Sequence, residues 1–348
     1  TELTLADLDY DLPEELIAQS PAERRDDSRL LYYQRADRSI THRKFSELPK
    51  LLRAGDLLVM NDSRVAPARF TLMKPTGGLI DALFVDEISV GRWRVMMRNL
   101  GAIKDELRLS VKDFPELIVH SITRTNDGLF EATIETTESA ATLLEKIGRM
   151  PLPPYIKREK LRDARDESDR DRYQTVFAQQ HGSIAAPTAG LHFTPAIFSE
   201  LDRIGIERAF VTLHVGLGTF KPIDVDDLSQ HKMHIERYTL SESTVEQINR
   251  AKREKRRIIT VGTTATRVLE SQPPGELRAT SGQTQLFIRP PCEFKHINAL
   301  ITNFHQPRST LIALVMAFMG IEEQKRAYTE AVRERYRFLS YGDSMFIE

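Results

Sequence analysis

Histidine and carboxylate side chains gather in the second half of the sequence, next to stretches of small residues. His192 follows the segment AAPTAGL at 185–191, and His214 opens the segment HVGLGTF. Histidines and carboxylates exchange protons near neutral pH, so these side chains suit general acid–base chemistry. The candidate catalytic residues are His192, His214, His234, Glu236 and Asp62.

The segment ITVGTTATRVLE at 259–270 predicts a strand, a tight turn and a helix. Because the first N–H groups of a helix lack intrahelical partners, Thr263 and Thr264 are candidates for binding an anion or a ligand carboxylate. A plain helix cap by either threonine explains the same residues equally well. The other candidate substrate-binding residues lie in polar or small-residue motifs: Arg64, Thr188, Gly190, Gly216, Gly218, Thr219, Asn303 and His305.

The segment HKMHIE at 231–236 suggests a metal site. It brings His231, His234 and Glu236 close together, and His214 could add a fourth ligand. A metal-dependent hydrolase that uses these four side chains is therefore an alternative. Their spacing matches no established zinc signature, so we expect a site without metal.

Length and charge limit the class of protein. The chain has 348 residues, of which 41% are hydrophobic, and this predicts a globular chain of more than one domain. Its 49 basic and 50 acidic side chains nearly cancel, so an RNA partner must be bound by a local patch. The basic run KREKRR at 252–257 could contact phosphates, and a non-catalytic RNA-binding protein is a further hypothesis.

Cysteine content and apolar runs indicate the compartment. The single cysteine, Cys292, excludes an internal disulfide and is expected to be buried. The first residues lack a basic region followed by an apolar run. The longest apolar run, Leu311 to Ile321, is shorter than the ~20 residues of a membrane helix. We expect a cytoplasmic protein without membrane contact, in which this run forms a buried helix.

The element pattern predicts an α/β main domain, a layered mixed sheet with flanking helices, carrying an inserted small antiparallel β-barrel. Short strands fill 64–138, with a hairpin turn at Asn126, Asp127 and Gly128. From 194 onward helices and strands alternate. Expected helix caps are Thr194, Ser241 and Ser309, and QLFIR at 285–289 is an expected strand. We predict an α/β catalytic domain at 1–63 together with 151–348, and the barrel domain at 64–150.

Eight motifs, taken together, resemble a known enzyme family. In chain order they are YDLPEELIAQSPAERRDDSRLL, NDSRVAPAR, RYQTVFAQQHGSIAAPTAGLHFT, TLHVGLGTFKPI, MHIERY, VGTTATRVLES, ITNFHQPRSTLIALV and SYGDSMFI. The sequence resembles the S-adenosylmethionine:tRNA ribosyltransferase-isomerase family of queuosine biosynthesis over nearly its whole length. It departs from the family after Pro290, where Pro291 and Cys292 stand in place of the usual glycine and aromatic residue.

The resemblance implies an activity. The ribosyl part of S-adenosylmethionine is transferred and isomerised onto 7-aminomethyl-7-deazaguanine at the wobble position of the tRNA anticodon. Epoxyqueuosine-tRNA forms, and adenine and methionine leave. S-adenosylmethionine is the cosubstrate, and no metal or other cofactor is expected. The barrel is expected to assist tRNA binding, and the enzyme is expected to be a monomer.

This chemistry needs a base and an acid. The sulfonium acidifies the 5′ carbon of the ribose, so a base can remove that proton and a donor can protonate the departing adenine. The resemblance leaves open which of the five candidate catalytic residues has which role. Arg64 and the turn at Thr263 and Thr264 could bind the methionine carboxylate, and an acidic group the ammonium.

Overall fold

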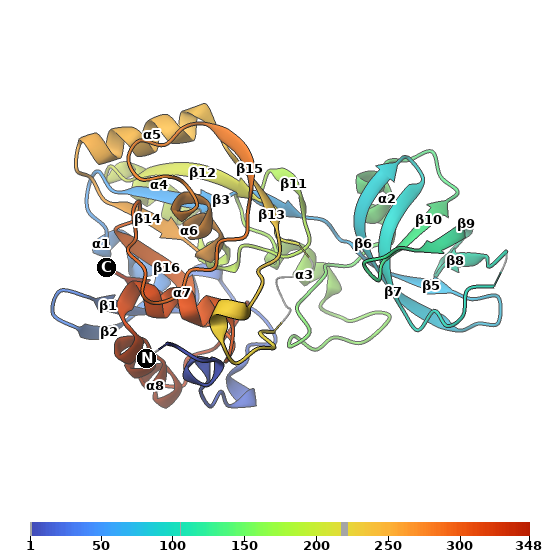
Figure 1. Ribbon diagram of the computed structural model, residues 1–348, viewed down its shortest axis with the longest axis horizontal. Coiled ribbons are helices and arrows are strands. Elements are labelled where there is room, and N and C mark those ends of the chain that lie inside the picture. The colour runs from blue at the N-terminus through green and yellow to red at the C-terminus, as the bar shows by residue number, and fades with distance from the viewer. Residues whose placement is uncertain (1, 105, 217–221) are drawn as a thin grey trace.

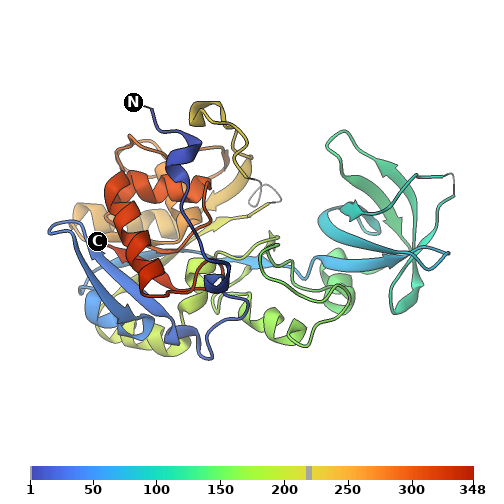
Figure 2. The same ribbon diagram turned by 90° about the horizontal axis from the view of Figure 1, so that it is seen from below.

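The computed structural model describes residues 2–104, 106–216 and 222–348. In these residues the chain forms a nine-stranded mixed sheet flanked by helices and a closed six-stranded barrel. The barrel stands to one side of the α/β domain in Figure 1, and Figure 2 shows the same separation from a second direction. The predicted fold class is confirmed.

The large sheet is parallel at its centre. Strands β12, β3, β14 and β16 run parallel, so their carboxyl ends meet at one edge of the sheet. Strands β13, β15 and β2 pair antiparallel with their neighbours, and β17 pairs antiparallel with β16 and parallel with β1. The strand order is β15 (Thr280–Thr284), β13 (Glu236–Leu240), β12 (Glu207–Leu213), β3 (Leu57–Asn61), β14 (Ile258–Val261), β16 (Ala299–Asn303), β17 (Ser344–Ile347), β1 (Arg29–Gln34) and β2 (Ser39–Lys44).

Helices bury both faces of this sheet. Leu57 and Val59 of β3 pack into one apolar cluster, whereas Leu58 packs into another on the opposite face, as the two-residue period of a strand requires. The first cluster contains side chains of α5 (Glu242–Arg253), α6 (Thr263–Glu270), α7 (Thr310–Met319) and α8 (Ile321–Arg333). The second contains side chains of α1 (Leu48–Leu51) and α4 (Pro195–Arg203).

The predicted helix caps are confirmed. Thr194 Oγ1 accepts the Ile197 N–H at 3.1 Å, and Ser241 and Ser309 cap α5 and α7 in the same way. The apolar run from Leu311 falls mostly within α7, which is a buried helix as expected. Of the helices in the described residues, none has the length and apolar content to cross a membrane.

The barrel has its own apolar core. Trp93 lies fully buried in it, with its ring edge-on to Phe70 at 5.8 Å between centroids. The helix α2 (Ala140–Ile147) adds Leu143 and Leu144 to the same core. Gly128 lies in the predicted hairpin turn with φ +80°. The barrel strands are β5 (Arg69–Met73), β6 (Leu79–Ser89), β7 (Arg92–Arg98), β8 (Leu109–Val111), β9 (Phe114–Arg124) and β10 (Phe130–Ile134).

Three shorter elements join the two parts. The strands β4 (Ser63–Val65) and β11 (Gln180–Ser183) form a small parallel pair, and α3 (Asp166–Arg172) follows the proline-rich stretch. The domain boundaries at 63/64 and 150/151 stay a prediction.

Two local predictions were wrong. QLFIR at 285–289 is not a strand. The pairing between β15 and β13 ends at Thr284, because its partner Glu236 is the first residue of β13. Ile288 reaches the main apolar cluster from a loop instead. Cys292 is exposed because it lies in the loop between β15 and β16, where its neighbours Pro291 and Glu293 are exposed as well.

Gly148 is the residue where α2 ends and the chain leaves the barrel. A Cβ there would lie 1.7 Å from the Pro67 carbonyl oxygen and 2.7 Å from that of Leu144. We expect Gly148→Ala to lower the free energy of unfolding by about 1–3 kcal/mol or more, because backbone atoms would have to move. Gly78→Ala is the control, since its Cβ would meet only the flexible Lys74 side chain at 3.4 Å. Urea unfolding followed by Trp93 fluorescence measures both, and equal midpoints would contradict the expectation.

Candidate functional site

A cavity of about 190 Å³ lies at the edge of the sheet where the central parallel strands end. Thr263 follows β14, Asn303 ends β16, and Glu236 begins β13 beside the end of β12; all three line the cavity. Carboxyl edges of parallel strands are the usual position of ligand crevices in α/β domains.

The cavity contains about half of the residues predicted from the sequence. Those that line it are Thr188, His234, Glu236, Thr263, Thr264, Asn303 and His305. Among the described residues, the predicted ones outside the lining are Asp62, Arg64, Gly190, His192, His214 and Gly216. Gly218 and Thr219 lie outside the described residues.

The small residues ahead of His192 form one wall of the cavity. Ala185 to Ala189 all line it, and their short side chains leave space beside the backbone. Gly190 has a packing role, because a Cβ there would lie 2.8 Å from Phe177 Cζ and 3.0 Å from Thr175 Cγ2.

His192 is buried behind the cavity and fully hydrogen-bonded. Its Nδ1 lies 2.7 Å from Ser28 Oγ and its Nε2 lies 3.0 Å from Asn303 Oδ1. The Asn303 amide nitrogen donates to two backbone carbonyls, so Oδ1 must accept the Nε2–H of His192, and Nδ1 accepts the Ser28 hydroxyl proton. Burial lowers the pKa of His192 to about 4. The neutral ring therefore holds Asn303 in position at the cavity.

Asp62 and His214 interact electrostatically next to the cavity, just beyond the ends of β3 and β12. Asp62 Oδ1 accepts the Thr212 hydroxyl at 2.6 Å. Burial raises the pKa of Asp62 and lowers that of His214, while the attraction between the two opposes both shifts. His214 Nδ1 is buried and, within the described part of the chain, has no hydrogen-bond partner. An acid and a base thus interact here, and His214 directly precedes the cavity-lining Val215.

Arg267 is a cavity residue that the sequence analysis missed. Its Nη1 donates to Glu236 Oε1 at 2.5 Å, and both side chains are buried. Glu236 Oε2 also accepts the Gly216 N–H at 3.3 Å. Arg267 comes one helical turn after Thr263 in α6, so the spacing TTATR was the signal that could have indicated it.

His305 and Arg64 differ in their position. His305 lines the cavity, its Nε2 lies 2.7 Å from Thr302 Oγ1, and burial lowers its pKa to about 3. Arg64 lies in β4, paired in register with His181 of β11.

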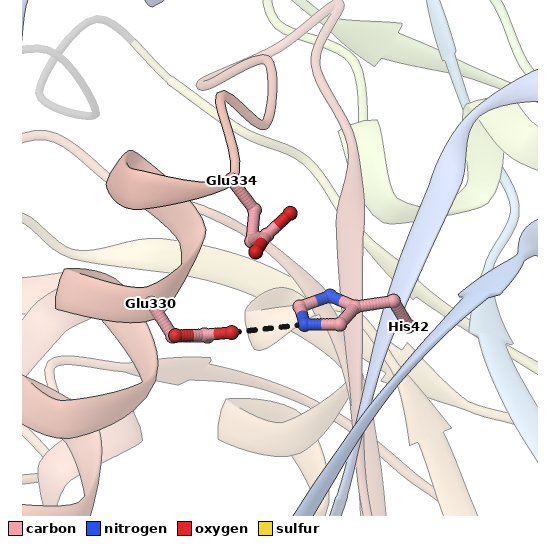
Figure 3. A group of neighbouring side chains, drawn as sticks. All are labelled: His42, Glu330 and Glu334. Carbon is pink, nitrogen blue, oxygen red and sulfur yellow. Dashed lines mark hydrogen bonds and ion pairs between the residues drawn. The ribbon is translucent and has the colours of Figure 1, made fainter.

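The predicted metal ligands do not come together. In the described residues the one group with three ligand atoms within 4.8 Å is His42, Glu330 and Glu334, none of which lines the cavity (Figure 3). His42 Nε2 already contacts Glu330 Oε1 at 3.0 Å, and Arg333 forms ion pairs with both carboxylates at 2.8 and 3.0 Å. This cluster is therefore a surface ion-pair network, and His214, His231, His234 and Glu236 form no such group within the ranges described.

Comparison with known proteins decides the family. The model of the queuosine biosynthesis protein family matches residues 5–347. The chain belongs to this family. It is 46% identical to the S-adenosylmethionine:tRNA ribosyltransferase-isomerase of Carboxydothermus hydrogenoformans, over 99% of this chain and 100% of that protein. The protein of the same name from Geobacter metallireducens is 45% identical over 98% of each chain.

A solved structure agrees with this result. The crystal structure of S-adenosylmethionine tRNA ribosyltransferase from Thermotoga maritima matches with a TM-score of 0.55 and 34% identity, over 98% of this chain and all of that one. The family predicted from the eight motifs is confirmed, and with it the expectation of a transferase of queuosine biosynthesis.

Proposed function

We propose that this chain is an S-adenosylmethionine:tRNA ribosyltransferase-isomerase. The observation that carries the proposal is its full-length similarity to proteins of that name. In the proposed reaction, the ribosyl part of S-adenosylmethionine is transferred to 7-aminomethyl-7-deazaguanine at the wobble position and isomerised. The products are epoxyqueuosine-tRNA, adenine and methionine.

The cavity is the proposed site for S-adenosylmethionine. Its wall of small residues, Ala185 to Ala189, leaves space for a substrate to approach the backbone closely. The start of α6 supplies N–H groups to an anion, and Arg267 rather than Arg64 is the arginine beside it. The substrate's own amine is the nucleophile, so we propose no enzyme nucleophile, no metal and no further cofactor.

Proton transfer is the chemistry proposed for the protein. His234 and Glu236 line the cavity, and the Asp62–His214 pair lies next to it. Because its pKa is lowered, His214 is neutral at physiological pH and can accept a proton. His192 is a positioning residue in this scheme, since both of its nitrogens are already bonded.

The partner and setting complete the proposal. The barrel domain at 64–150 assists binding of a tRNA that carries the deazaguanine. We propose that the enzyme is a cytoplasmic monomer that does not contact a membrane.

Product analysis tests the function. The protein is incubated with S-adenosylmethionine and an anticodon stem-loop carrying 7-aminomethyl-7-deazaguanine, and we expect adenine and methionine to appear together. The same stem-loop with guanine at the wobble position is the control and should yield neither. S-adenosylhomocysteine in place of adenine would show methyl transfer instead. Salt-dependent RNA binding without any small product would show a non-catalytic protein.

A further inference from the structure

The guanidinium of Arg267 has an incomplete set of hydrogen bonds. Arg267 is 7% exposed, and among the described residues only its Nη1 has an acceptor, which is Glu236. Nε and Nη2 are buried and lack a hydrogen-bond partner among the residues that the structure describes. Buried N–H groups without acceptors are rare and destabilising, so this edge is suited to an acceptor from outside the chain.

The unpaired edge has the geometry for a carboxylate. Nε–H and one Nη2–H lie on the same side of the planar guanidinium and point in the same direction. Two parallel N–H groups match the two oxygens of a carboxylate, and the resulting charge-assisted pair is stronger than neutral hydrogen bonds.

A second feature at the same place attracts negative charge. Helix α6 starts after Gly262, whose φ is +94°, and in the described structure no side chain caps it. Its first N–H groups, at Thr263 and Thr264, carry the positive end of the helix dipole. Thr263, Thr264 and Arg267 all line the cavity, and helical side chains tilt toward the N-terminus, which directs Arg267 to the start of its own helix.

Glu236 places a negative charge beside this anion site. Its Oε1 is occupied by Arg267 Nη1 at 2.5 Å, but its Oε2 has a longer contact of 3.3 Å with the Gly216 N–H. Oε2 can therefore accept a further hydrogen bond from a cation. One wall of the cavity thus offers a cationic edge and a carboxylate oxygen together, which is the complement of an α-amino-acid zwitterion.

We propose that the Arg267–Glu236 pair recognises the α-amino-acid group of S-adenosylmethionine. The Nε and Nη2 groups of Arg267 bind the carboxylate together with the start of α6, and Glu236 Oε2 accepts a hydrogen bond from the ammonium. This inference rests on the proposed function. Glu236 then binds the ammonium, and the proposed proton transfer falls to His234 and the Asp62–His214 pair.

The test compares S-adenosylmethionine with its decarboxylated analogue at saturating stem-loop. For the wild type, kcat/KM should favour S-adenosylmethionine at least about 30-fold, the value of one buried charged pair. Arg267→Lys keeps the charge and can still pair with Glu236, but it cannot present two parallel N–H groups. We expect this variant to reduce the kcat/KM preference for S-adenosylmethionine by a factor of at least about ten.

Arg257→Lys is the matched control. Arg257 is also largely buried and forms ion pairs with two carboxylates, but it lies outside the cavity lining as described. It should keep the wild-type preference. If Arg267→Lys lowered kcat/KM by the same factor for both substrates, the proposal would be overturned. That result is expected if the arginine has only a structural role. A wild type that does not use S-adenosylmethionine at all would refute the proposed function instead.

A second variant keeps the proposal testable if Arg267→Lys does not fold. Glu236→Gln preserves shape but removes the charge that the ammonium needs. We expect it to reduce the kcat/KM preference for S-adenosylmethionine over its deaminated analogue about tenfold relative to the wild type. The preference over the decarboxylated analogue should persist. An unchanged preference over the deaminated analogue would refute the role of Glu236.

Discussion

Replacing Arg257 by methionine is expected to lower the free energy of unfolding by about 3–5 kcal/mol. Arg257 Nε and Nη2 bind the two oxygens of Asp56 at 3.0 and 2.7 Å, and Nη1 binds Glu348 Oε2 at 2.7 Å. Asp56 is only 2% exposed, so the substitution leaves a buried carboxylate without its cation. These contacts also join the last residue of the chain to the start of β14.

A surface arginine provides the control for this prediction. Arg333 is 65% exposed and pairs with Glu330 within the same helix, so Arg333→Met should cost less than about 1 kcal/mol. Urea unfolding monitored by Trp93 fluorescence and by circular dichroism measures both variants. Similar losses for Arg257→Met and Arg333→Met would show that the buried network does not stabilise the fold.

His192 is expected to make the fold sensitive to mild acid. Its folded pKa of about 4 lies below the ordinary value of 6.5, so between these pH values the unfolded chain binds a proton that the folded chain does not. The stability that His192 contributes is therefore present above pH 6.5 and is lost as the pH falls toward 4. The loss amounts to about 3 kcal/mol over the whole window.

His192→Gln isolates this effect, because glutamine can still donate to Asn303 but does not titrate. Its free energy of unfolding should change less with pH than that of the wild type, by up to about 1.4 kcal/mol per pH unit between the two pKa values. His181→Gln is the control, since His181 is exposed. Parallel pH profiles for the wild type and His192→Gln would contradict a buried neutral histidine.

Local chemistry explains which parts of the fold could be predicted from the sequence. Thr194, Ser241 and Ser309 were correctly identified as caps because a cap depends on a side chain and an N–H group only three residues apart. The hairpin at Gly128 followed from a turn residue that adopts positive φ. QLFIR failed as a strand for the opposite reason, because its apolar residues are buried by distant elements and not by strand pairing.

The candidate site shows the same division. The small residues at Ala185 to Ala189 and the turn at Thr263 were visible as motifs, and the structure places both at one cavity. Arg267 was missed because its spacing from Thr263 indicates a shared helix face but not burial. Its position depends on Glu236, which belongs to a different strand.

The sequence by itself determined the class of fold, the family and the segments that carry the site, since periodicity, caps and motifs are properties of short stretches. Only the tertiary structure decided which polar side chains meet. It turned His192 away from solvent to hold Asn303, and it placed Arg267 rather than Arg64 beside the start of α6. The physical reason is that burial and pairing depend on residues far apart in the chain. Burial keeps His192 neutral, and pairing with Glu236 leaves one edge of Arg267 without an acceptor in the described structure.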